Sequence, residues 1–75
     1  MTEIAPRITS NPGMFGGKPC IRNMRFRVQD VLEYLAAGET RETLLADFPF
    51  LEDEDITAAL DYAAKSLPSH AVAAE

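Results

Sequence analysis

The sequence predicts one small, mainly α-helical domain in which a short N-terminal β-hairpin precedes a three-helix, helix-turn-helix or homeodomain-like bundle. Three observations indicate this fold. The chain has 75 residues, which is enough for a single domain. Turn-forming Gly, Pro and Asn residues interrupt its first part, whereas apolar residues recur at helical spacing after Val28. The connections between the helical segments are short, which is typical of helices that cross at a steep angle.

The β-hairpin region is expected to span residues 7–28. After a β-prone stretch and an Asn-Pro-Gly turn signal, two extended pieces follow at 18–22 and 25–28. Asn23-Met24 separates them, and Asn tolerates the left-handed conformation of a tight turn. Apolar residues and arginines alternate along the second piece, so we expect the arginines to form a solvent-facing row.

The first helix is predicted from the apolar spacing that follows the hairpin. Its stripe recurs at i, i+3, i+4, i+7 and i+8. The stripe consists of Val28, Val31, Leu32, Leu35 and Ala36. Gly38 is expected just after the end of this helix, since glycine adopts positive φ without strain.

Thr40 is expected as the N-cap of a second helix, which Pro49 ends. A third helix begins within the acidic run 52–55 and continues to Pro68. A solvated helix start explains the acidic run better than a calcium site, because the run lacks alternating oxygen ligands around a glycine bend. The expected apolar stripe of this helix is Ile56, Ala59, Leu60, Ala63, Ala64 and Leu67.

These elements define a domain over residues 7–67, with the hairpin region at 7–28 and three helices at 29–67. Residues 1–6 and 68–75 are expected to be flexible tails.

Charge is divided unevenly along the chain, whose net charge is −5. Residues 1–28 carry five basic residues and one acid, hence +4, and residues 29–75 carry two basic residues and eleven acids, hence −9. Carboxylates on the third helix would repel DNA phosphates, which disfavours conventional recognition-helix binding. The candidate DNA-binding residues are therefore the hairpin cations Lys18, Arg22, Arg25 and Arg27. The alternative is that these cations pair with the chain's own acids.

The sequence offers no set of catalytic, cofactor-binding or metal-binding residues, so we expect a protein that is not an enzyme. One Cys and one His cannot complete a tetrahedral zinc site. Cys20 is expected to be a small core residue. The glycine-rich segment around Lys18 is no phosphate-binding loop. Pro12 stands where that motif has its first glycine, and Pro19 stands where it has Ser or Thr.

A homodimer is expected because the core is thin. Of the 75 residues, 47% are hydrophobic, but eleven of these are alanines, which bury little area. Apolar residues left over for partner binding are Met14, Phe15, Met24 and Phe50. No apolar run is long enough to cross a membrane and no signal peptide is visible, so a cytoplasmic location without membrane contact is expected.

Five segments together resemble a bacterial and archaeal family. Residues 16–28 read GGKPCIRNMRFRV and resemble the "GGKPVIRGTRIPV" signature of domain-of-unknown-function family 433. The other segments resemble its "I-x-x-[DN]-P" at 8–12, its "LAAG" at 35–38 with "[IL]L-x-D-[YF]P" at 44–49, and its "DI-x-AAL-x-YAA" at 55–64.

The resemblance implies a small helix-turn-helix-like domain of the antitoxin type found in type II toxin–antitoxin pairs. Such a protein would form a dimer, bind and silence a PIN-like ribonuclease toxin, and repress its own operon. The first functional hypothesis is therefore an antitoxin-like, DNA-binding regulator. The alternative is a non-enzymatic protein-interaction module that docks a basic partner through its acidic helices and binds no DNA.

Overall fold

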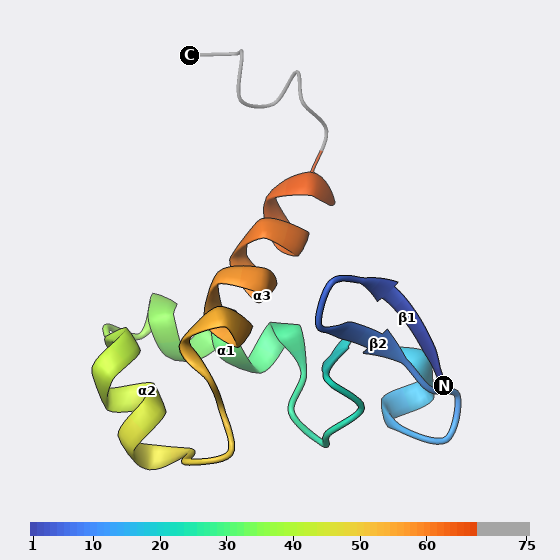
Figure 1. Ribbon diagram of the computed structural model, residues 1–75. Helices are drawn as coiled ribbons and strands as arrows, with labels where there is room; N and C mark the ends of the chain where they lie inside the picture. The colour runs from blue at the N-terminus through green and yellow to red at the C-terminus, as the bar shows by residue number, and fades with distance from the viewer. Residues whose placement is uncertain (68–75) are drawn as a thin grey trace.

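The computed structural model describes residues 1–67 and confirms a small N-terminal sheet followed by three helices (Figure 1). The expected tail at 68–75 lies outside the described residues. The strands are β1 (Thr2–Ala5), β2 (Ile8–Ser10) and β3 (Cys20–Ile21), and the helices are α1 (Val28–Ala36), α2 (Arg41–Asp47) and α3 (Asp53–Lys65).

The sheet has three antiparallel strands in the order β1-β2-β3, which corrects two expectations. Residues 2–5 form β1 and pair with β2, so most of the expected N-terminal tail is part of the sheet. The expected second hairpin arm at 25–28 is no strand, because only an isolated bridge joins Cys20 and Arg27 before α1 begins.

The turn after β3 lies one residue earlier than expected. Arg22 (φ 44°) and Asn23 (φ 58°) are both left-handed, and the Met24 N–H donates to the Ile21 carbonyl at 2.8 Å. Two consecutive positive φ values define a type I′ turn, which here is centred on Arg22-Asn23. The left-handed Asn is confirmed, but its turn partner is an arginine on the N-terminal side.

The helix boundaries follow the local signals that predicted them. Gly38 (φ 102°) follows the C-cap of α1. The Thr40 side chain accepts the backbone N–H of Thr43 at the start of α2. Both features depend only on neighbouring residues, so they could be predicted from the sequence without the tertiary structure.

The core lies where the sheet, α1 and α2 meet the N-terminal half of α3, at the centre of Figure 1. Its fully buried aliphatic side chains are Ile8, Ile21, Val31, Leu44 and Ile56. The buried face of α3 differs from the expected stripe, because Leu60 and Leu67 are exposed whereas Tyr62 packs against the core. No helix within residues 1–67 is long and apolar enough to cross a membrane.

Candidate functional site

Asp55, on the first turn of α3, is a fully buried carboxylate with 0% exposure. Each of its oxygens accepts two hydrogen bonds. Oδ1 accepts from Arg7 Nη1 at 2.8 Å and from Arg22 Nε at 3.0 Å. Oδ2 accepts from Arg22 Nη2 at 2.8 Å and from the Glu52 N–H at 2.9 Å. All four lone-pair positions of this buried carboxylate are therefore satisfied.

Two turns at one end of the sheet bring the arginines together. Ile8 pairs with Ile21 across β2 and β3, so the residues beside them, Arg7 and Arg22, are also opposite each other. The Arg22 N–H donates to the Arg7 carbonyl at 2.9 Å. Both residues are left-handed, with φ of 65° for Arg7 and 44° for Arg22, an uncommon conformation for residues with a Cβ. The tertiary structure therefore holds both arginines against the start of α3.

We call Arg7, Arg22, Glu52 and Asp55 the Asp55 cluster. Arg7 Nη1 also donates to Glu52 Oε1 at 2.7 Å, and Arg22 Nη2 donates to the Phe50 carbonyl at 2.9 Å. The cluster links the sheet to α3 and to the segment before it.

The charges of the Asp55 cluster stabilise one another. Burial alone would raise the pKa of Asp55, but hydrogen bonds from Arg22, the Glu52 N–H and Arg7 outweigh it and lower that pKa to about 2. Hydrogen bonds to Glu52 and Asp55 raise the pKa of Arg7, and the hydrogen bond to Asp55 raises that of Arg22. The carboxylate and both guanidinium groups are therefore ionised at neutral pH.

A second ion pair occupies another hairpin arginine. Arg27 donates to Asp30 through Nε at 3.1 Å and through Nη2 at 2.7 Å. This two-point contact lowers the pKa of Asp30 and raises that of Arg27. The Arg27 guanidinium also lies 5.1 Å from the centre of the Phe15 ring. Arg27 is therefore fixed by its own chain.

The candidate DNA-binding residues thus fall into two pairs. Arg22 and Arg27 are ion-paired internally, so Arg27 does not join Arg25 in the solvent-facing row that the sequence predicted. Lys18 and Arg25 are exposed and form no ion pair within residues 1–67. The hypothesis of internal pairing is confirmed for Arg22 and Arg27 but not for Lys18 and Arg25.

Exposed carboxylates without an ion pair are concentrated on the helical part of residues 1–67. We call them the acidic helical residues: Glu33, Glu39, Glu42, Asp47 and Glu54. They are spread over α1, the α1–α2 connection, α2 and α3. Internal pairing therefore leaves the helical region strongly acidic toward a partner.

The apolar partner-binding candidates do not form one site. Phe15 and Phe50 are 41% and 47% exposed, whereas Met14 is half-buried and Met24 packs against the core. The Phe50 ring belongs to an aromatic cluster with Phe26, Tyr34 and Phe48, whose ring centres are 4.8–6.3 Å apart. Tyr34, which was not among the residues predicted to bind a partner, is 40% exposed at the edge of this cluster.

Residues 1–67 contain no group of His, Cys, Asp and Glu side chains that could hold a metal ion. Cys20 is 1% exposed, which confirms it as a core residue, and burial raises the pKa of its thiol. A buried thiol with a raised pKa is a poor nucleophile.

The Asp55 cluster was missed because the acidic run was interpreted as solvated. A signal for Asp55 was present, since Asp55, Ala59 and Tyr62 are spaced i, i+4 and i+7 and share one helix face. The equivalent signal for Arg7 and Arg22 did not exist, because positive φ at an arginine has no sequence signature.

The structure is that of a small helical domain, in which a buried carboxylate and two arginines join a three-stranded sheet to three helices. The model of the family described as "Protein of unknown function (DUF433)" matches residues 8–63. The chain therefore belongs to the DUF433 family, as its signature indicated.

Two known proteins are similar to this chain, one in sequence and one in structure. The uncharacterized protein y4eO of Sinorhizobium fredii (strain NBRC 101917 / NGR234) is 41% identical over 56 residues, which are 75% of this chain and 25% of that protein. The crystal structure of a DUF433 member from Anabaena variabilis ATCC 29413 has 37% identity and a TM-score of 0.75, covering 79% of this chain and 58% of that one. This chain spans only a quarter of the length of the curated relative.

Proposed function

We propose that this protein is a non-enzymatic, antitoxin-like interaction module that docks a basic partner protein through its acidic helical residues. The observation that carries the proposal is the imbalance after internal pairing. Within residues 1–67, five exposed carboxylates on the helical part have no ion pair, whereas only Lys18 and Arg25 remain among the basic side chains. Such a surface attracts a cationic partner and repels phosphate.

The resemblance to antitoxins suggests which partner to test, namely a PIN-like ribonuclease toxin encoded beside this chain's gene. Exposed aromatic side chains support a docking role as well, since Tyr34 and Phe50 are 40% and 47% exposed. Aromatic residues are enriched at the energetic centres of protein interfaces.

Neutralising the acidic helical residues is expected to slow association with that partner. For a triple variant Glu33→Gln, Glu42→Gln and Asp47→Asn, we expect the association rate at low salt to fall about tenfold, because electrostatic steering is lost. The measurement is the rate of binding of the full chain to the immobilised neighbouring gene product, at low and at moderate salt. Changing these exposed side chains leaves the core and the Asp55 cluster intact.

The matched control is a double variant, Lys18→Met and Arg25→Met, which removes the unpaired cations instead. It is expected to associate as fast as the wild type or faster. Slower association of this control, together with an unchanged triple variant, would contradict docking through the acidic helical residues.

DNA binding is the second candidate function, and the exposed, unpaired Lys18 and Arg25 favour it. We propose it for a homodimer, which a light-scattering mass near twice 8.2 kDa would support. Two available cations per chain give a dimer about four phosphate contacts, so a plot of log affinity against log salt should have a slope of about −3 to −4. All four hairpin cations would give about −7.

The DNA test is a titration of the chain onto its own upstream DNA at several salt concentrations. The steeper slope would show that Arg22 and Arg27 leave their carboxylates on DNA binding, contrary to the pairing seen in the structure. No shift even at low salt would exclude the DNA hypothesis and leave protein docking.

A further inference from the structure

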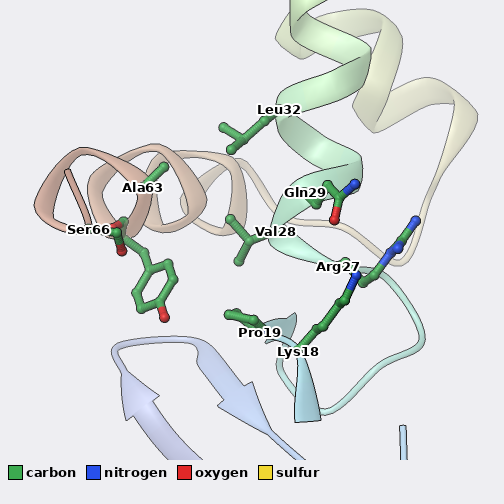
Figure 2. A pocket seen from close by; sticks show the side chains of 9 residues that line it. Lys18, Pro19, Arg27, Val28, Gln29, Leu32, Ala63 and Ser66 are labelled. Carbon is green, nitrogen blue, oxygen red and sulfur yellow. The ribbon is translucent and has the colours of Figure 1, made fainter. Parts of the chain in front are cut away.

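One concave surface of the molecule lies apart from both the Asp55 cluster and the aromatic cluster. It is a groove of about 250 Å³ between the segment before β3, the first turns of α1 and the C-terminal half of α3 (Figure 2). The residues that line it are Lys18, Pro19, Arg27, Val28, Gln29, Leu32, Tyr62, Ala63 and Ser66.

The walls of the groove are apolar. Val28 and Leu32 of α1 face Ala63 of α3 across the gap, and Pro19 closes the side toward the sheet (Figure 2). Tyr62 adds an aromatic side chain to the α3 wall. A surface of this kind favours an apolar ligand, because binding removes apolar area from water on both sides.

On the α3 side, Ser66 lines the groove and its hydroxyl donates to the Tyr62 carbonyl at 2.8 Å. The charged and amide side chains of the groove, those of Lys18, Arg27 and Gln29, lie together at another edge (Figure 2). Two of these are already engaged, since Arg27 pairs with Asp30 and the Gln29 amide donates to Glu33 at 3.0 Å. The Lys18 ammonium forms no ion pair within residues 1–67. The groove therefore presents one uncompensated positive charge beside an apolar surface.

We propose that this groove binds a small apolar carboxylate, whose chain lies between α1 and α3 and whose anionic group meets Lys18. Charge complementarity selects the carboxylate, because a cationic ligand would face Lys18 and Arg27 at the edge of the groove. Size selects a small molecule, because 250 Å³ lies just below the usual range of about 300–1,000 Å³ for ligand pockets. This site is independent of the proposed docking through the acidic helical residues.

The probe is octanoate, titrated into the 15N-labelled full chain while amide chemical shifts are recorded. Perturbed amides are expected around the groove, at Lys18, Val28 to Leu32 and Tyr62 to Ser66. Octanol and octyltrimethylammonium serve as neutral and cationic comparisons of equal chain length. Octanoate is expected to bind about tenfold more tightly than octanol, since a charge-assisted hydrogen bond to Lys18 is added.

The variant Lys18→Met keeps the apolar stem and removes the charge. It is expected to abolish the preference for octanoate over octanol, that is, to weaken octanoate binding about tenfold. Arg25→Met is the matched control, because Arg25 is the other exposed cation without an ion pair in the described part of the chain and does not line the groove. It should bind octanoate as the wild type does.

Three outcomes would overturn the proposal. Equal binding of the three probes would show that charge does not select the ligand. Perturbed amides confined to other regions would place the site elsewhere. The third outcome is a wild-type chain that forms a dimer and binds no octanoate, together with a Leu32→Gln variant that no longer dimerises. This result would show that a second copy of the chain covers the groove.

Discussion

Replacing Asp55 with Asn is expected to destabilise the protein by about 3 kcal/mol. Asn keeps the size of the side chain but removes its charge and replaces one acceptor oxygen with a donor group. The two guanidinium groups then face a buried amide that cannot accept all three of their hydrogen bonds. Removing one partner of a buried ion pair costs about 3–5 kcal/mol, and the lower end applies because both arginines are about one-third exposed.

The control is the same change two residues earlier on α3. The Asp53 side chain is 62% exposed and pairs with Arg41 at 2.9 Å, so Asp53→Asn should cost less than about 1 kcal/mol. Urea unfolding followed by circular dichroism gives both values. Similar losses for the two variants would show that the buried Asp55 carboxylate contributes no more than a surface ion pair.

The free energy of unfolding is expected to fall steeply in acid because of the same carboxylate. Its pKa is lowered to about 2 in the folded state, against 3.8 for an unperturbed aspartate. A lowered pKa means that the stabilisation is complete above about pH 4 and is lost as the pH falls toward 2. The shift corresponds to about 2 kcal/mol. Asp30, whose pKa is also lowered, acts in the same direction.

Urea unfolding of the wild type and of Asp55→Asn between pH 7 and pH 2 measures this contribution. The stability difference between them should be constant above about pH 4 and shrink by about 2 kcal/mol on further acidification. Two curves that stay parallel down to pH 2 would mean that Asp55 titrates as it does in the unfolded chain.

The helical part of the fold was predictable because its signals are local. Gly38 and Thr40 lie close to the bonds that they satisfy, and both act as expected. The sheet was less predictable because its pairing is not local. Nothing within Thr2–Ala5 indicates that it forms a strand, and only pairing with β2 makes it one.

The charges of the candidate site could be predicted from the sequence, but the ion pairs that they form could not. The sequence shows a basic hairpin and acidic helices, but it cannot show that Arg22 reaches an aspartate 33 residues away. The type I′ turn explains this, because left-handed φ at Arg22 directs its side chain toward α3 instead of continuing the strand. The alternation of Arg25, Phe26 and Arg27 likewise predicted exposure, and Arg27 turns back to Asp30.

The ion pairs change the functional expectation for this chain. Arg22 belongs to the segment that resembles the family signature, and it serves the fold by holding α3. Within residues 1–67, DNA would find two unpaired cations, whereas a basic protein would meet a helical surface of unpaired carboxylates. The interaction-module hypothesis therefore has the stronger physical support.

The most direct test of this account is a double-mutant cycle on the free energy of unfolding with Arg22→Met and Asp55→Asn. If Arg22 is committed to the fold, the two changes are strongly non-additive, with a coupling of about 1–2 kcal/mol. A coupling near zero would contradict the account, because Arg22 would then be available to a ligand and the hairpin would again be the leading candidate for DNA binding.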